Sequence, residues 1–393
     1  MRFQFRPGHA RAKAATALAL GGLATAAVAA LAAPASAATS ATAHGRFPHQ
    51  ASHAVFVQTD NTAGNQVVAY HRSAGGTLTL AGTYNTGGKG GQLTGSVVDH
   101  LASQGSLQYD ARQRVVIAVN AGSNTVSVFW AFGDRLILRQ VISSGGRFPV
   151  SVAIRGSLVY VLNALKGGSV QGYRLFFGRL YPLPGSNRPL HLDPTATPQF
   201  TNTPGQVAFS PNGSQLIVTT KANGNDIDVF AVASSGRLSA SPVVNTEGST
   251  VPFAITFDQA GHLVIADAGT NALSTFTLNS DGTVTLIDSA GTGQSATCWV
   301  APAGPFLYAS NAGSASESGF TSSAGGQLTL LGATPTDPGT VDASAAAGGR
   351  FLYVQTGGAG IVDEFSVGSG GSLTEIGTVT VPGAAGGEGI VAF

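Results

Sequence analysis

The sequence predicts an all-β fold, a seven-bladed β-propeller, and three observations support this prediction. A short apolar segment ending in a polar residue recurs seven times, and the steps between these ends are 61, 43, 57, 47, 44 and 45 residues. Glycine-rich turns separate the short apolar segments, and the two ends of the chain complete each other. A period of roughly 40–50 residues made of short strands is typical of propeller blades. The polar ends are Thr59, Asn120, Asn163, Thr220, Asp267, Asn311 and Thr356.

The fourth repeat shows the predicted plan of one blade most clearly. Residues 206–209 form an innermost strand, and the turn Ser210-Pro211-Asn212-Gly213 leads to a second strand at 215–220. A third strand follows at 227–232, and an outer strand begins at Arg237. The strand residues alternate or are β-branched, and each turn carries the Gly, Asn or Pro that a tight reversal requires.

The two ends of the chain predict how the ring closes. The first repeat begins directly at its second strand, residues 54–57, whereas the last six residues, 388–393, align with the innermost strand of the fourth repeat. The C-terminal strand should therefore close the first blade, which removes exposed sheet edges.

The N-terminal residues predict export. Arg2, Arg6, Arg11 and Lys13 precede a soft apolar stretch, and Ala35-Ser36-Ala37 offers a cleavage site, so residues 1–37 are predicted to be a signal peptide. A retained membrane anchor is the alternative, because the stretch approaches spanning length. Residues 38–53 are expected to be a flexible lead-in and residues 54–393 the propeller, secreted and without a membrane span.

Two insertions interrupt the repeat, at residues 88–104 and 185–203, and both are expected to decorate one face of the disc. The chain has one cysteine, Cys298, so it has no internal disulfide. No group of His and Cys residues has the spacing of a zinc site. The glycine-rich stretches are not followed by a helix, as a phosphate-binding loop would be, so we expect neither a metal nor another cofactor.

Repeats such as Asn120 to Phe129 and Phe209 to Gly213 resemble the lactonase family of seven-bladed propellers. That family includes 6-phosphogluconolactonase-like and carboxymuconate lactonising enzymes and is close to the YVTN-repeat surface proteins. The resemblance implies His, Arg and Glu around the central mouth. At the matching positions this chain has Val150-Ser151, Gly205-Gln206 and Lys221, so the catalytic groups of the family are missing there. The resemblance therefore implies the fold of the family but not its activity.

One residue in each repeat is predicted to face the central channel. The channel-mouth candidates are small and mostly uncharged, which suits either a neutral ligand or a water-filled tunnel. A single carboxylate in this ring is too few for calcium. The candidates are Ser106, Ser151, Gln206, Thr297 and Asp342, with Arg147 beside them and Ala254 and Ile390 completing the ring.

Charge is distributed unevenly along the chain. Residues 38–237 hold 15 Lys or Arg and 7 Asp or Glu, whereas residues 238–393 hold Arg350 alone against 12 acids. The basic residues are spread over several strands, so nucleic acid is not the expected partner. The asymmetry is either without function or an oriented contact with a second copy or with a polyanion of the cell wall. The basic contact would come from Arg112, Arg114, Arg135, Arg139 and Arg174.

The sequence therefore predicts a secreted, monomeric, lactonase-like propeller that acts as an extracellular binding module for a cell-wall polymer or a protein. The alternative is a hydrolase of a lactone or sugar-derived ester that uses the mouth near Ser151, Gln206 and Arg147. A base at the mouth would favour the enzyme, and its absence favours the binding module.

Overall fold

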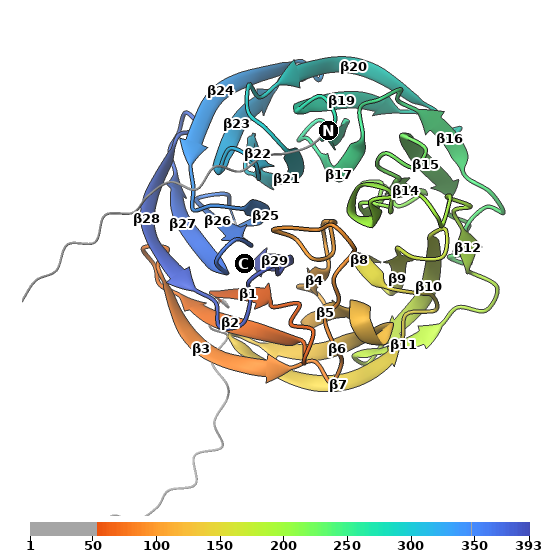
Figure 1. Ribbon diagram of the computed structural model, residues 1–393, viewed down its shortest axis with the longest axis horizontal. Helices are drawn as coiled ribbons and strands as arrows, with labels where there is room; N and C mark the ends of the chain where they lie inside the picture. The colour runs from red at the N-terminus through yellow and green to blue at the C-terminus, as the bar shows by residue number, and fades with distance from the viewer. Residues whose placement is uncertain (1–52, 347) are drawn as a thin grey trace, which may run out of the picture. The chain divides into compact units, whose positions relative to one another are not determined.

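Residues 53–346 and 348–393 are described by a computed structural model, in which seven antiparallel sheets are arranged as a ring (Figure 1). The predicted signal peptide and nearly all of the predicted lead-in lie outside the described residues. Two short 3-10 helices, η1 (Ala121–Ser123) and η2 (Gln199–Thr201), are the only helices in the described ranges, and none there could cross a membrane.

Each sheet is one blade, with its first strand nearest the centre of the ring in Figure 1. Blade one is β29 (Ile390–Ala392), β1 (Ala54–Gln58), β2 (Gln66–Arg72) and β3 (Leu78–Asn85); blade two is β4 (Leu107–Asp110), β5 (Val115–Asn120), β6 (Thr125–Phe132) and β7 (Arg135–Ser143). Blade three is β8 (Pro149–Arg155), β9 (Leu158–Asn163), β10 (Ser169–Phe176) and β11 (Arg179–Pro182), with β12 (Arg188–Pro189) also on β10.

The remaining four blades follow the same order. Blade four is β13 (Val207–Phe209), β14 (Gln215–Thr219), β15 (Asp226–Ala231) and β16 (Val243–Thr246); blade five is β17 (Pro252–Phe257), β18 (Leu263–Asp267), β19 (Ala272–Leu278) and β20 (Val284–Gly291). Blade six is β21 (Thr297–Ala303), β22 (Phe306–Asn311), β23 (Ser316–Ser322) and β24 (Leu328–Pro335); blade seven is β25 (Thr340–Ala345), β26 (Phe351–Thr356), β27 (Ile361–Val367) and β28 (Leu373–Thr380). The seven-bladed prediction is confirmed.

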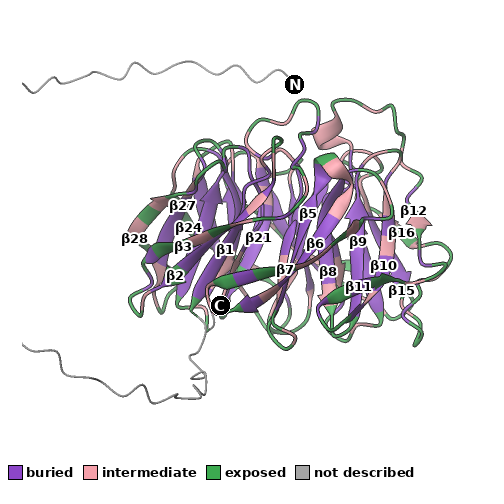
Figure 2. Cartoon of the chain, turned by 90° about the horizontal axis from the view of Figure 1, so that it is seen from below, coloured by how far each residue is buried: buried purple, intermediate pink, exposed green. Residues whose placement is uncertain are grey.

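The repeated apolar segment is the second strand of every blade. All of its residues are buried in each of the seven copies, because the strand packs against neighbouring sheets on both faces. Figure 2 shows this buried interior and the more exposed outer strands β3, β7 and β28. The core therefore lies between adjacent blades.

A tyrosine in three of these second strands fastens one blade to the next. Tyr160, Tyr308 and Tyr353 each donate their hydroxyl to a carbonyl in the outer turn of the following blade, at 2.8, 2.9 and 2.6 Å. The accepting residues are glycines with φ of 83°, 82° and 97°, a left-handed conformation that favours glycine. The accepting glycines are Gly236, Gly371 and Gly76.

The C-terminal strand closes blade one, as predicted. In the antiparallel pairing of β29 with β1, Phe56 lies opposite Val391 and Val57 lies opposite Ile390. The terminal Phe393 stacks on Tyr109 of blade two, with ring centroids 4.0 Å apart. Closure therefore also joins blade one to blade two.

The outer strand of blade four begins at Val243, so its predicted start at Arg237 is wrong. Residues near 237 make only an isolated bridge, between Val232 and Leu238. Arg188 of β12 donates to the carbonyls of Leu238 and Ser239 at 2.8 and 2.7 Å. Arg188 of the second insertion thus occupies carbonyl groups next to the bridge, where a regular outer strand would otherwise form. Regular pairing with β15 begins only at Val243.

Candidate functional site

The first insertion enters the ring, where residues 99–105 form what we call the plug (Figure 1). Ser103 donates its hydroxyl to the carbonyl of Val150 in blade three, at 2.9 Å. On the opposite side of the ring, Gln104 exchanges two hydrogen bonds with the backbone of Val300, and Trp299 Nε1 donates to the Ser103 carbonyl at 2.7 Å. The plug therefore bridges blades three and six across the centre.

This arrangement corrects two expectations. The first insertion does not only decorate a face, because residues 99–105 pass between the blades. The channel that was expected to hold a neutral ligand or water is likewise not open at this level of the ring, because the plug crosses it between blades three and six. The physical reason is the set of backbone and side-chain hydrogen bonds that hold the plug to distant blades, which no repeat pattern encodes.

Three predicted channel residues meet the plug or its flank, and their polar atoms are engaged there. Ser106 donates its hydroxyl to the Glu388 carbonyl at 2.7 Å, and Ser151 donates to the Gln104 carbonyl at 2.7 Å. Gln206 Oε1 accepts from the Ile255 amide at 2.5 Å. All three side chains are buried. These groups hold the plug and the inner strands together.

The other predicted site residues lie in different settings. Thr297 is buried within blade six and donates to Asn311 Oδ1 at 2.6 Å. Arg147 is exposed on the segment that leads into β8. Asp342 is buried in blade seven and shares a hydrogen bond with Glu388. The structure brings Asp342 to the plug and leaves Arg147 and Thr297 apart from it.

Buried carboxyl groups gather around the plug, and the sequence analysis found only Asp342 among them. Glu388 Oε1 accepts from the Gly105 amide at 2.9 Å. Burial raises the pKa of Glu388 well above its ordinary value, and the neighbouring charge of Asp342 adds to this. Burial likewise raises the pKa of Asp342 to about 7 and that of Asp99 to about 6. Asp60 is also buried, and its pKa rises for the same reason.

Lys221 is the buried cation beside the plug. Its Nζ donates to the carbonyls of Ala102 and Phe200 at 2.6 and 2.7 Å and to Thr203 Oγ1 at 3.2 Å. Burial lowers the pKa of Lys221 to about 7, while the nearby charge of Asp99 opposes the change. An ammonium has three donors, and all three have acceptors here. Lys221 therefore fastens the plug to the second insertion.

A small apolar cavity of about 170 Å³ adjoins Lys221. Lys221 Nζ lies 5.2 Å from the ring centroid of Phe253. The single thiol, Cys298, lines the same cavity, and burial raises its pKa to about 12, which suppresses the reactive thiolate. Within the described ranges no group of three His, Cys, Asp or Glu could hold a metal ion. The cavity can accept a small apolar group, and Lys221 and Asp99 are among the residues that line it.

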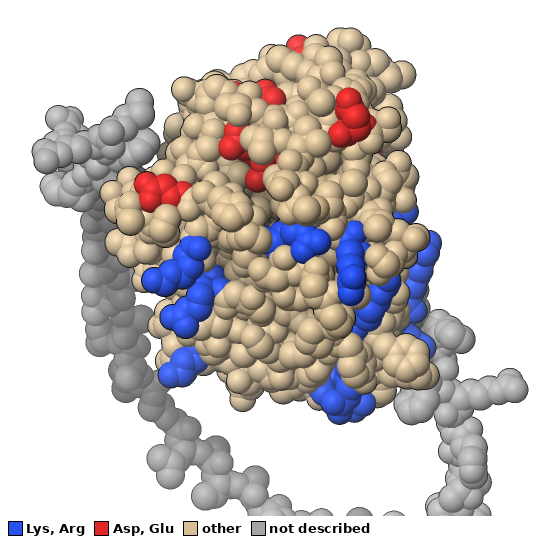
Figure 3. Space-filling view, turned by 90° about the vertical axis from the view of Figure 1, so that its right-hand side faces the viewer, with Lys and Arg blue, Asp and Glu red and all other residues tan. Residues whose placement is uncertain are grey.

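The charge asymmetry is visible on the surface. Figure 3 shows Lys and Arg gathered in the lower part of one side and Asp and Glu in the upper part. Half of the twelve acids in residues 238–393 are buried, and burial raises the pKa of each, so these six carry less negative charge at neutral pH than the sequence suggests. They are Asp267, Glu317, Asp342, Asp363, Glu364 and Glu388. At neutral pH the positive charge of residues 38–237 therefore contributes more to the asymmetry than the negative charge of residues 238–393.

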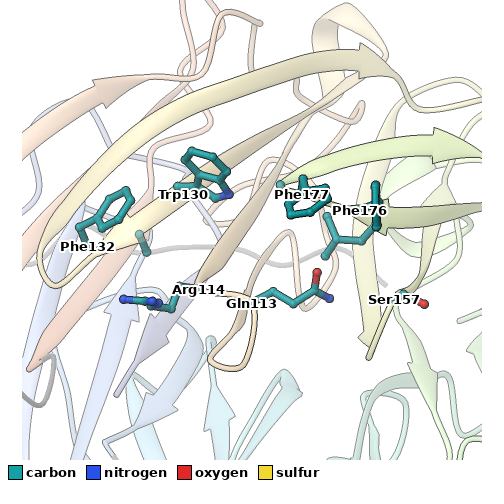
Figure 4. A pocket seen from close by; sticks show the side chains of 10 residues that line it. Gln113, Arg114, Trp130, Phe132, Ser157, Phe176 and Phe177 are labelled. Carbon is teal, nitrogen blue, oxygen red and sulfur yellow. The ribbon is translucent and has the colours of Figure 1, made fainter. Parts of the chain in front are cut away.

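A larger groove, of about 520 Å³, lies between blades two and three, and we call it the rim groove (Figure 4). Aromatic side chains from β6 and from the β10–β11 turn face one another across it, with polar residues below. Its labelled lining residues are Gln113, Arg114, Trp130, Phe132, Ser157, Phe176 and Phe177. The sequence analysis named Arg114 as a basic contact and missed the aromatic residues, although outer turns elsewhere in the chain lack aromatic residues.

Comparisons with known proteins agree with this architecture. A family model described as "Lactonase, 7-bladed beta-propeller" matches residues 187–300. The resemblance to lactonase-like propellers is confirmed. A putative 6-phosphogluconolactonase from Bacteroides uniformis is 19% identical, with a TM-score of 0.70 over 87% of this chain and 99% of the other.

Two further solved structures share the fold. The periplasmic gluconolactonase PpgL of Pseudomonas aeruginosa is 17% identical, with a TM-score of 0.68 over 86% of this chain and 98% of the other. A protein from Lactobacillus plantarum is 19% identical, with the same TM-score and coverage. No curated protein sequence matches the chain. Because these sequence identities are below 20%, the similarity to the solved structures establishes the fold of the chain alone.

Proposed function

We propose that this lactonase-like propeller is exported and acts as a binding module whose central mouth does not hydrolyse lactones. The observation that supports this most is the plug, which occupies the centre of the ring and uses the polar groups that a reaction would need. The predicted signal peptide at residues 1–37 supports export, and one neighbour of the same fold is described as periplasmic.

Hydrolysis of a lactone requires a base that activates water and donors that stabilise the developing oxyanion. All three Nζ donors of Lys221 are directed to protein acceptors. The two carboxylate oxygens of Asp99 accept from the amides of Leu101 and Ser103 at 2.7 and 2.9 Å. These are contacts of groups that hold a loop in place.

A second candidate is hydrolysis of a lactone or sugar-derived ester, and the comparisons favour it. The family model that matches is described as a lactonase, two of the neighbours are described as a putative 6-phosphogluconolactonase and a gluconolactonase, and a cavity lies beside Lys221. The pKa values of Lys221 and Asp99, about 7 and about 6, also suit proton transfer near neutral pH. In this account a water molecule in the cavity would be activated by Asp99.

Turnover separates the two candidates. Acid release from 6-phosphogluconolactone, gluconolactone and simple aliphatic lactones should equal the rate in buffer for the wild-type chain. Lys221→Met, Asp99→Asn and Gln206→Ala are assayed beside Arg147→Ala, and circular dichroism monitors the fold of each. Turnover that persists in Arg147→Ala and disappears in folded Asp99→Asn would establish the hydrolase and overturn the binding module.

A further inference from the structure

Blades two and three differ from the other five at one position of the shared plan. The turn between the third and outer strands is rich in Ser, Gly and Asn elsewhere, as in Ser323-Ala324-Gly325-Gly326. In blade two this turn carries Phe132, and in blade three it carries Phe176 and Phe177. These two turns are neighbours, and both border the rim groove.

The three phenylalanines are exposed to an extent that the fold does not require. Phe132, Phe176 and Phe177 are 48%, 61% and 74% exposed. Phe177 also has a φ of 47°, a left-handed conformation that favours Gly or Asn and costs energy in a bulky residue. An exposed aromatic ring on a strained turn stabilises neither the core nor the turn, and such strain is associated with binding sites.

Contacts hold two residues that line the groove, Trp130 and Gln113, in place. The guanidinium carbon of Arg139 lies 3.9 Å from the ring centroid of Trp130, a cation–π contact that holds the indole. Gly178 packs against the indole, since a Cβ there would lie 2.2 Å from Trp130 Nε1. Gln113 is held by a hydrogen bond of 2.6 Å to the Gly156 carbonyl. These contacts give a preformed groove, which lowers the entropic cost of binding.

The charge around the groove is positive. Residues 107–182, which form blades two and three, contain nine Lys or Arg and two acids, Asp110 and Asp134. Arg114 lines the groove and is exposed. An exposed guanidinium can bind a carboxylate through two parallel hydrogen bonds. The groove therefore combines flat apolar surfaces with a group that selects an anion.

We infer that the rim groove binds an acidic oligosaccharide, a chain of pyranose rings that bear carboxylates. The C–H groups on one face of a pyranose carry partial positive charge and pack on the negative face of an aromatic ring. Phe132, Phe176 and Phe177 supply such faces, and Arg114 pairs with a carboxylate of the sugar. A groove of about 520 Å³ has the size of a site for a small ligand. This inference rests on the proposed function and specifies its ligand class.

The test uses titration calorimetry of the wild-type chain with an oligogalacturonate. The methyl ester of the oligogalacturonate tests whether binding needs the carboxylates. Poly-glutamate tests whether a polyanion without sugar rings binds equally well, and neutral phospholipid vesicles test whether the groove binds a lipid surface instead. Phe177→Gly removes a ring and relieves the strained φ, so this variant should remain folded. Arg114→Gln removes the cation. The matched controls are Leu286→Ser, an exposed apolar residue of blade five, and Arg237→Gln, an exposed arginine of blade four.

Oligogalacturonate should bind, and its affinity should fall at least about threefold in Phe177→Gly and in Arg114→Gln while both controls bind as wild type does. Equal binding of the methyl ester, binding of poly-glutamate that Phe177→Gly leaves unchanged, or absence of oligogalacturonate binding would each overturn the inference. The inference would also be overturned if the protein bound the vesicles but not oligogalacturonate, and if this vesicle binding were lost in Phe177→Gly. Lactone turnover lost in Asp99→Asn but not in Phe177→Gly would refute the proposed function separately.

Discussion

Glu388 Oε1 accepts a hydrogen bond of 2.9 Å from the backbone amide of Gly105. Glu388 lies two residues before β29, the strand that closes blade one, and Gly105 ends the plug. One buried carboxyl group therefore contributes both to closure of the ring and to closure of its mouth. The same group shares a hydrogen bond with Asp342.

The protein should lose stability as pH rises from about 4 to about 7. Burial raises the pKa of Glu388, and it raises that of Asp342, Asp267 and Glu317 to about 7, 7 and 8. In this window the folded state binds more protons than the unfolded state, so the free energy of unfolding falls as pH increases. His100 and Lys221, whose pKa values burial lowers, act in the opposite direction, Lys221 mainly above about pH 7, where it loses its proton in the folded state.

Scanning calorimetry should therefore give a higher Tm at pH 5 than at pH 7.5. Glu388→Gln should reduce this difference, whereas Glu375→Gln, a change at an exposed carboxylate, should leave it as in the wild type. A Tm that is constant or rises between pH 5 and pH 7.5 would contradict the presence of a protonated buried network.

Lys221→Met should destabilise the protein by ~2–6 kcal/mol, because two buried carbonyls lose their donor at ~1–3 kcal/mol each. The substitution leaves the carbonyls of Ala102 and Phe200 without a donor and Asp99 without its nearby cation. Lys166→Met, at an exposed lysine, should change stability by less than about 0.5 kcal/mol. Urea unfolding of both variants measures the difference, and equal midpoints would show that Lys221 does not fasten the plug.

Deletion of residues 388–393 should destabilise the ring by several kcal/mol. Among the apolar side chains of this segment Ile390 is the most deeply buried, at 3% exposure, whereas Val391 and Phe393 are partly buried. Ile390→Ala alone should cost ~2–5 kcal/mol, the range for a truncated core side chain. Leu286→Ala, at a residue 56% exposed, is the control for thermal unfolding. Unchanged melting of the truncated chain would refute the split first blade.

The native protein should focus at a higher pH than the urea-unfolded protein in isoelectric focusing. Carboxyl groups whose pKa burial raises lose negative charge in the folded state, among them Asp228 and Asp363, each with a pKa of about 7. Unfolding exposes them to water and restores their charge near pH 6. Coincident native and unfolded bands would mean that these carboxyls are ionised in the fold.

The blades could be predicted from the sequence because each one is specified locally, by an apolar strand and a turn that recur with a fixed period. The ring closure could be predicted because the surplus strand at residues 388–393 resembles the strand missing before Ala54. The plug could not, since residues 99–105 have no strand periodicity and their partners, such as Val300, lie far away in sequence.

The buried groups were missed for a related reason. A comparison of one position per blade finds Asp342 but passes over Asp60, Asp99 and Glu388, which reach the centre from loops and from the chain end. Lys221 was recognised only as a departure from the family pattern, because its three acceptors lie on the two insertions, outside the repeat. The aromatic turns of blades two and three did carry a readable signal, namely a large apolar residue where the other blades have small polar ones.

Hydrogen exchange across the plug tests the central claim most directly, because a binding module with a closed mouth requires the plug to be a fixed part of the fold. The amides of Leu101, Ser103 and Gly105 donate to the buried carboxylates of Asp99 and Glu388. Peptides covering residues 99–106 should therefore exchange in the native protein as slowly as β5 and β9. Exchange as fast as at the exposed turn residues 234 and 235 would show that the plug opens readily, and that the mouth is accessible to a substrate.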